Sequence, residues 1–237
     1  MAVGKDAADL QKKIGYRFRN VELLDNALTH SSYSNECKSR GVAAPCNERL
    51  EFLGDAVLQI RVSDYLYGEF PEFDEGFLTK MRQFLVCEGT LARCARAVNL
   101  GDYLHLGKGE EQNNGRHRDS ILADAFEALL AAIYLDSDKD TETVRVFLFA
   151  RLEKEIDSCV KSRGGDYKSR LQQLVQQDGS EKLIYETVDE TGPDHAKIFT
   201  VEARINSNIV GCGKGHTKRE AEQEAARQAL ALFGISE

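Results

Sequence analysis

The chain has 237 residues, of which 42% are hydrophobic, enough for one large domain or two of ordinary size. The segment from Met1 to Lys12 is charged and has no apolar run, which argues against a secretory signal, and no stretch has the apolar length of a membrane helix. We therefore expect a cytoplasmic protein without membrane contact. The net charge of −8 and the pI of about 5.3 weigh against a nucleic-acid partner, so any such contact must come from a local cluster.

The first part of the chain predicts helices. Apolar residues recur at helical spacing in four segments: 50–65, 77–98, 120–135 and 143–156. Stretches that contain glycine or proline separate these segments. A polar stretch with Gly164 and Gly165 follows. We expect an all-α domain over residues 1–159 and a linker over 160–165.

The pattern then changes to a mixture of helical and strand periods. Helices are predicted over 167–177 and 217–233, with alternating, strand-like segments between them at 183–188, 196–205 and 208–213. The middle strand should turn one face to a core, and the last helix should carry one apolar stripe of Ala221, Ala225, Ala229 and Phe233. The order α-β-β-β-α predicts a compact α+β domain over residues 166–236.

Acidic residues interrupt the first of the apolar helices. Glu48, Glu51 and Asp55 are offset by three and seven positions, so they lie within about 60° of one another on a helix. Glu48 alone is readily explained by an ion pair with Arg49 or by capping of the helix. Glu51 and Asp55 are the only charges in the rest of an apolar stretch, so they need another explanation.

The helix over 120–135 makes the same point more strongly. Its only charges are Asp124 and Glu127, and their neighbours on the wheel are Ala128 and Ala131, where a solvated face would carry Lys or Gln. Buried carboxylates take up protons unless a cation keeps them charged. Four carboxylates from two helices offer the oxygen ligands that Mg²⁺ or Mn²⁺ prefers, and such a site can activate water for phosphodiester hydrolysis.

A third acidic spot precedes the segment 77–98. There, Asp74 and Glu75 are explained as the cap and the first turn of a helix, without a functional role. A basic cluster near the C-terminus is less ordinary. Lys218 and Arg219 fall in the first turn of a helix, where the helix dipole disfavours cations, and Lys214 lies just before it. These residues predict a phosphate-binding site, although a solvated basic cluster is an equal alternative from the residues alone.

The segment Asn47-Glu-Arg-Leu-Glu-Phe-Leu-Gly-Asp55 closely resembles the signature of the ribonuclease III catalytic domain. The resemblance continues through 27–33 (Ala-Leu-Thr-His-Ser-Ser-Tyr), 73–76 (Phe-Asp-Glu-Gly) and 120–129 (Ser-Ile-Leu-Ala-Asp-Ala-Phe-Glu-Ala-Leu). The C-terminal unit resembles a double-stranded-RNA-binding domain. The resemblance thus covers nearly the whole chain, in the bacterial domain order.

This resemblance implies a metal-dependent endonuclease that acts on double-stranded RNA. It assigns the divalent metal, usually Mg²⁺ and with Mn²⁺ able to substitute, to Glu51, Asp55, Asp124 and Glu127, and ties hydrolysis most directly to Asp55 and Glu127. It places Glu48 and Glu75 in the catalytic valley and Phe52 at a homodimer interface, although by spacing alone Phe52 is a core residue. It also implies products with 5′-phosphates, 3′-hydroxyls and short 3′ overhangs, and processing of ribosomal and other structured precursor RNAs.

In the RNA-binding domain the resemblance adds contacts to the basic cluster. It assigns a minor-groove contact to His195 and sugar or groove contacts to Ser169, Gln172 and Gln173. Two other classes of function remain as alternatives. A non-catalytic double-stranded-RNA-binding protein would be marked by loss of one of the four carboxylates, and none is missing. An all-helical scaffold with a binding tail leaves Asp124 and Glu127 unexplained.

Overall fold

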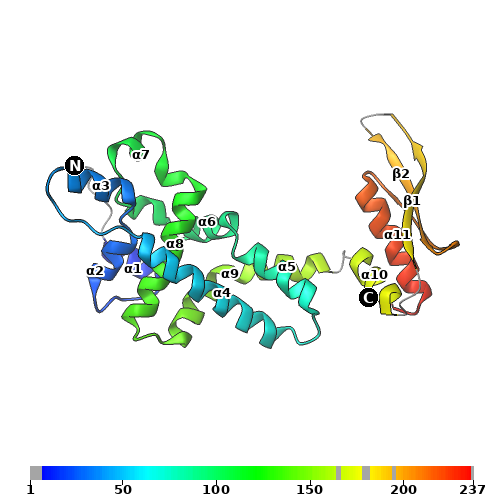
Figure 1. Ribbon diagram of the computed structural model, residues 1–237, viewed down its shortest axis with the longest axis horizontal. Coiled ribbons are helices and arrows are strands. Elements are labelled where there is room, and N and C mark those ends of the chain that lie inside the picture. Colours follow the sequence, from blue (N-terminus) through cyan, green and yellow to red (C-terminus); the bar gives the residue numbers. More distant parts are fainter. Residues whose placement is uncertain (1–6, 164–166, 178–181, 194–195, 236–237) are drawn as a thin grey trace. The chain divides into compact units, whose positions relative to one another are not determined.

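The computed structural model describes residues 7–163, 167–177, 182–193 and 196–235. The chain divides into two compact units, Met1–Ile156 and Asp157–Glu237, and each is described by itself (Figure 1). Within the described ranges, no helix is both long enough and apolar enough to span a membrane. The first unit is helical, as predicted, and the second contains a three-stranded sheet with two helices.

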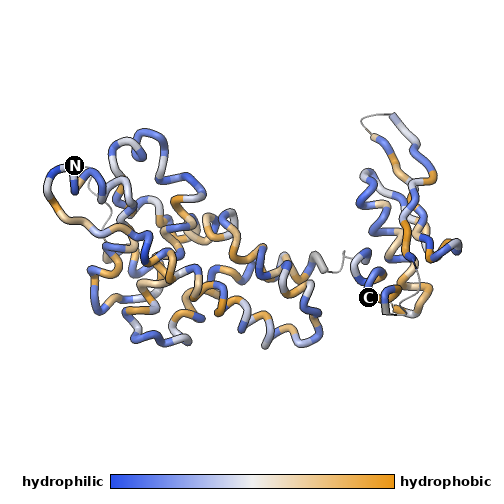
Figure 2. The backbone as a smooth tube through the Cα atoms, viewed as in Figure 1, coloured by the Kyte–Doolittle hydropathy of each residue, from blue (hydrophilic) through white to orange (hydrophobic). Residues whose placement is uncertain are grey.

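The first unit is built around one central helix. Its elements are α1 (Ala7–Ile14), α2 (Val21–Ala27), α3 (Ser31–Ser39), α4 (Glu48–Glu69), α5 (Glu75–Leu85), α6 (Glu88–Ala97), α7 (Lys108–Gln112), α8 (Asp119–Asp136) and α9 (Thr141–Arg163), with the 3₁₀ helices η1 (Leu100–Tyr103) and η2 (Gly115–His117). Helix α8 packs against α2, α4 and α6, and its hydropathy is apolar along most of its length (Figure 2). Leu129, Leu130 and Ile133 have no exposed surface.

Two details of the helical prediction were wrong. The single helix predicted over 77–98 is two helices, because Val86 ends α5 and Cys87 has an extended backbone that begins α6. The hydroxyl of Thr90 donates a hydrogen bond of 2.7 Å to the Phe84 carbonyl oxygen, which has no helical partner at this break. The apolar spacing continues across the break and so does not reveal it. Helix α9 also extends to Arg163, so residues 160–163 of the predicted linker are helical; the predicted domain boundaries at 159 and 166 stay predictions.

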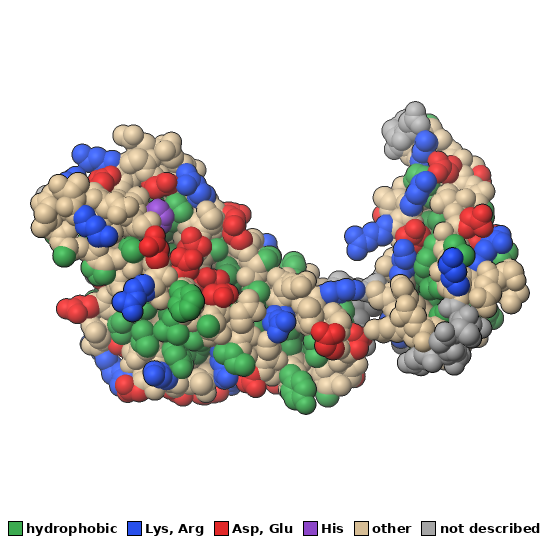
Figure 3. Space-filling model, in the orientation of Figure 1, with side chains coloured by type: hydrophobic (Ala, Val, Ile, Leu, Met, Phe, Trp, Pro, Cys, Tyr) green, Lys and Arg blue, Asp and Glu red, His purple; other side chains and the backbone are tan. Residues whose placement is uncertain are grey.

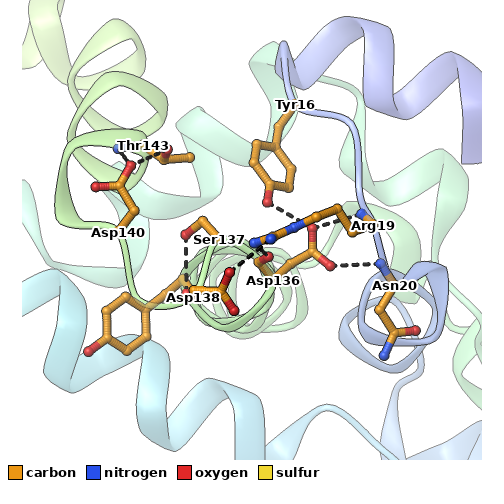
Figure 4. Close-up of polar contacts among 9 residues, drawn as sticks. Tyr16, Arg19, Asn20, Asp136, Ser137, Asp138, Asp140 and Thr143 are labelled. Atoms are coloured by element: carbon orange, nitrogen blue, oxygen red, sulfur yellow. Dashed lines mark hydrogen bonds and ion pairs between the residues drawn. The ribbon is translucent and has the colours of Figure 1, made fainter.

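The end of α8 is fastened to the segment before α2 by the buried carboxylate of Asp136 (Figure 4). Asp136 accepts hydrogen bonds from the Tyr16 hydroxyl at 2.8 Å and from the backbone N–H groups of Arg19 at 2.9 Å and Asn20 at 2.7 Å. Burial favours the protonated acid, but these hydrogen bonds outweigh it and lower the pKa of Asp136. The link holds α2 against the helix that carries Asp124 and Glu127.

The second unit has the predicted order α-β-β-β-α. Its elements are α10 (Tyr167–Gln177), β1 (Leu183–Thr191), β2 (Ile198–Ile205), β3 (Asn208–Gly215) and α11 (Lys218–Leu232), and the antiparallel strands follow the order β1-β2-β3. Val201, Ala203 and Ile205 are buried on one face of β2, as the alternation predicts. Ala221, Ala225 and Ala229 are buried as expected on α11, whereas Phe233 is 46% exposed because it lies beyond the last turn of the helix.

Glycines on β3 let α11 lie directly on the sheet. A Cβ atom at Gly211 would lie 2.1 Å from the carbonyl oxygen of Ala225, and one at Gly213 would lie 2.2 Å from the carbonyl oxygen of Ala221. Alternate residues of a strand face the same side, so the two glycines present bare backbone to the alanine stripe of the helix. This contact fixes where the N-terminus of α11 emerges beside the sheet.

Candidate active site and RNA-binding surface

The acidic site forms where α4 crosses α8. A Cβ atom at Gly54 would lie only 2.0 Å from the carbonyl oxygen of Glu127, so the two helices approach as closely as their backbones allow. Gly54 immediately precedes Asp55 and lies one turn from Glu51, which places both acids at the crossing. Sequence analysis noted the small residues Ala128 and Ala131 on α8 but missed Gly54 on α4. The sequence offered a signal for Gly54, because a glycine inside a helix lowers helix stability by about 1 kcal/mol relative to alanine and so needs a packing reason.

Three carboxylates at the crossing, those of Glu51, Asp124 and Glu127, are partly withdrawn from water, and the acids repel one another. Burial raises the pKa of Glu127 to about 8, and further increases come from the negative charges of Asp55, Glu51 and Asp124. Burial also raises the pKa of Glu51, with added repulsion from Asp124, Glu48 and Asp55. All four predicted metal-binding carboxylates, together with Glu48, therefore belong to one electrostatic cluster. Within the described residues, no Lys or Arg side chain pairs with any of the four.

Asp124 has an additional neighbour that sequence reasoning did not assign. Burial is the main cause that raises the pKa of Asp124; the charge of His30 acts in the opposite direction, and Glu88 raises the pKa further. His30 caps α3, and its Nδ1 accepts a hydrogen bond of 3.2 Å from the Ser32 N–H. The motif over 27–33 thus reaches the acidic site through its histidine.

The donor set suits a hard divalent cation, since every candidate ligand is a carboxylate. In the described part of the chain, however, no three His, Cys, Asp or Glu side chains stand close enough together to hold a metal ion. Gly54 lets the backbones of α4 and α8 meet, so the four carboxylates still belong to the two helices of one crossing.

The other predicted residues of the first unit lie around this cluster. Glu48 and Asp55 are exposed, and Glu48 has a contact of 3.5 Å with the Cys46 thiol rather than an ion pair with Arg49. Asp74 caps α5 as predicted, and Glu75 in its first turn accepts a hydrogen bond of 3.0 Å from the Thr79 hydroxyl. Figure 3 shows Asp and Glu side chains gathered beside an exposed apolar patch on one face of this unit.

Phe52 contributes to the exposed apolar surface of α4. Its side chain is 81% exposed, so the interpretation of Phe52 as a core residue was wrong. Ile60 at 57% and Tyr67 at 80% exposure lie within about 80° of Phe52 around the helix axis, which continues the stripe along one face of α4. An apolar stripe of this kind on a helix marks an interaction surface.

Three basic residues of the second unit, Lys214, Lys218 and Arg219, lie at or just before the start of α11. The Thr217 side chain accepts from the Glu220 N–H, and the Glu220 carboxylate accepts from the His216 N–H, which together cap the helix. Beside this cap, a hollow between α11 and the strand ends is lined by Lys214 and Arg219, among others. Both cations have no partner among the described residues. Lys218 differs, because its Nζ lies 3.0 Å from Glu190 Oε1.

The remaining predicted RNA contacts lie on α10 and on the loop between β1 and β2. Gln172 and Gln173 are exposed on α10, and Ser169 is half-buried. Helix α10 is held against α11 by an ion pair between Lys168 and Glu222, at 2.5 Å, so the exposed face of α10 is fixed relative to the basic cluster. His195 lies outside the described residues.

Comparison with known proteins decides the family. Residues 20–152 match the family model described as ribonuclease-III-like, and residues 167–232 match the double-stranded RNA binding motif. The chain belongs to the ribonuclease III family. Proteins named ribonuclease 3 from Caldanaerobacter subterraneus subsp. tengcongensis and Pelotomaculum thermopropionicum are 49% and 50% identical to it, over 95% and 93% of this chain and 97% and 90% of theirs.

A solved structure supports the ribonuclease III fold of the first unit. The nuclease domain of ribonuclease III from Campylobacter jejuni is 38% identical, with a TM-score of 0.57, and the match covers 63% of this chain and 97% of that one. The predicted fold, an all-α ribonuclease III domain followed by an α+β RNA-binding domain, is thereby confirmed.

Proposed function

We propose that this member of the ribonuclease III family hydrolyses phosphodiester bonds of double-stranded RNA with a divalent metal held by Glu51, Asp55, Asp124 and Glu127. The observation that carries the proposal is the crossing of α4 and α8 at Gly54, where burial raises the pKa of Glu127 to about 8. A group of unpaired acids at a helix crossing destabilises the fold, and such a cost persists where function requires it. Mg²⁺ is the favoured ion, and Mn²⁺ should substitute.

The acidic residues of the catalytic unit have different proposed roles. When bound, the divalent ion supplies an activated water and stabilises charge on the phosphodiester. Asp55 on α4, which is exposed, and Glu127 on α8, which is partly buried, are the two acids that we tie most directly to hydrolysis. Glu48 at the start of α4 and Glu75 at the start of α5 line the valley that receives the RNA.

We infer further that the catalytic unit works as a homodimer through the exposed stripe of Phe52, Ile60 and Tyr67. The structure from Campylobacter jejuni is described in terms of a region involved in dimer formation of its nuclease domain, which supports a dimer but does not identify the residues of its interface. Two sites related by a twofold axis would cut opposite strands. The proposed products carry 5′-phosphates, 3′-hydroxyls and short 3′ overhangs.

The RNA-binding unit would grip the duplex through the start of α11 and the exposed face of α10. Lys214, Lys218 and Arg219 are proposed to contact phosphates, where their charge adds to the positive end of the helix dipole. Gln172 and Gln173 are exposed as a minor-groove contact requires, and Ser169 and His195 complete the proposed set. The proposed cellular role is processing of ribosomal and other structured precursor RNAs in the cytoplasm.

The first experiment is gel analysis of an end-labelled RNA duplex incubated with the full chain in Mg²⁺, in Mn²⁺ and in EDTA. We expect short duplexes with 5′-phosphates in either metal and intact RNA in EDTA. Binding without cleavage in both metals would instead identify a non-catalytic RNA-binding protein and leave the acids at the helix crossing with a structural role.

A further inference from the structure

An extra residue in β1 changes which face of the sheet Glu190 occupies. At the start of the strand, Leu183 and Tyr185 lie opposite Ile205 and Ala203 of β2, which face the helices. Directly opposite residues of an antiparallel pair point to the same side, so the odd-numbered residues of β1 face the helices there. In a regular strand Glu190 would therefore point to the outer face.

A β-bulge at Val188 reverses this alternation. Thr187 pairs with Val201 and Asp189 with the adjacent Thr200, so Val188 has no partner on β2. Beyond the bulge, Glu190 lies opposite Phe199. Phe199 and Val201 are two residues apart on β2 and therefore point to the same side of the sheet. Glu190, opposite Phe199, now faces the helices. Bulges that re-aim a side chain are common beside functional sites.

The re-aimed carboxylate meets the first residue of α11. The Nζ atom of Lys218 lies 3.0 Å from Glu190 Oε1 and 5.5 Å from the centre of the Phe199 ring. Both side chains stay accessible, with 57% exposure for Lys218 and 41% for Glu190. Lys218 is thus the cation of the proposed phosphate-binding cluster that already has an anionic partner.

We propose that Glu190 limits the affinity of this protein for double-stranded RNA by competing with phosphate for Lys218. A phosphate that contacts the ammonium must displace a carboxylate or share the cation with it at close range. The exposed ion pair is weak enough to be displaced, but its loss is subtracted from the binding free energy. Lower affinity favours dissociation of the cleaved duplex. The inference rests on the proposed RNA contact of Lys218.

The test measures binding of a fluorescent RNA duplex to the full chain by anisotropy, in EDTA and over a range of salt concentrations. Glu190→Gln should tighten binding about fivefold at low salt, and should make the dependence of log K on log salt steeper by up to about one. Glu186→Gln is the matched control. It removes the same charge from the same strand, but its carboxylate lies 3.3 Å from Arg204 on the outer face, and binding should change by less than about twofold.

A second pair of variants separates this inference from the proposed role of Lys218. In a Lys218→Ala background, Glu190→Gln should no longer tighten binding. An equal gain in that background, or an equal gain from Glu186→Gln, would show a general effect of charge and overturn the inference while leaving RNA binding by Lys218 intact. If Lys218→Ala by itself leaves affinity unchanged, both the phosphate contact and the competition are wrong.

Discussion

In both units a glycine allows two backbones to pack closely, but the site beside it is acidic in one unit and basic in the other. In the catalytic unit, Gly54 lets α4 meet the backbone of α8, and in the RNA-binding unit, Gly213 lets α11 meet β3, with Cβ positions 2.0 and 2.2 Å from a carbonyl oxygen. The first contact draws acids into partial burial, which raises the pKa of Glu127 to about 8. The second leaves Lys214 and Arg219 exposed at the helix start. Burial thus governs the acidic site, whereas salt-screened attraction should govern the basic one.

The largest expected effect is a loss of cleavage that leaves RNA binding intact. Glu127→Gln removes the charge with little change of volume, and should lower the cleavage rate by about a thousandfold, as loss of a preorganised charged group typically does. Binding of duplex RNA should remain within about twofold, because the cations of the second unit are untouched. Cleavage is measured on an end-labelled duplex in Mg²⁺ and binding by anisotropy in EDTA. Cleavage at the normal rate would remove Glu127 from the proposed site.

Substitution of Gly54 tests whether close approach of the helices is essential. Gly54→Ala places a methyl group against backbone that cannot rotate away, so we expect a loss of about 1–3 kcal/mol in the free energy of unfolding and loss of cleavage. Gly68→Ala in the same helix is the control. Its Cβ meets open space, and this change should stabilise the helix by about 0.5–1 kcal/mol. Chemical denaturation followed by circular dichroism measures both. Equal stabilities of the two variants would contradict the tight crossing.

The basic side of the comparison is tested by its salt dependence. Replacement of both Lys218 and Arg219 by Ala should weaken duplex binding and flatten the plot of log K against log salt by about one to two, because fewer phosphate counterions are released. Single-turnover cleavage at saturating protein should change much less, since the acids are unaffected. An unchanged salt slope would exclude both residues as phosphate contacts.

A further prediction concerns the pH dependence of stability in the metal-free protein. The ordinary pKa of a glutamate, 4.5, applies to the unfolded chain, whereas burial raises that of Glu127 to about 8 in the folded state. Between these values the folded protein holds a proton that the unfolded chain has released, so the free energy of unfolding should fall as pH rises from about 4.5 to 8. Mg²⁺ should reduce this fall by stabilising the charged carboxylates. Denaturation curves in EDTA across that range test it, and a slope that Glu127→Gln leaves unchanged must come from other groups.

The sequence by itself determined the order of elements and the identity of the acids. Helical periodicity found α4, α8 and both helices of the RNA-binding unit, because a buried face repeats its apolar residues every turn. Asp124 and Glu127 stood out because an apolar, alanine-rich helix has no ordinary use for two carboxylates. The alternation along β2 predicted its buried face for the same reason of regular geometry.

Only the tertiary structure decided which side chains meet and which stay exposed. Phe52 has the spacing of a core residue, but its side chain lies on the open face of α4, and a wheel cannot show which face a neighbour covers. The break at Val86–Cys87 rests on a side-chain hydrogen bond that apolar spacing does not record. The pairing of Glu190 with Lys218 depends on one unpaired residue at Val188, which reverses the faces of β1. The periodicity of a sequence describes one helix or strand at a time, whereas tertiary packing brings together residues that are far apart in the chain.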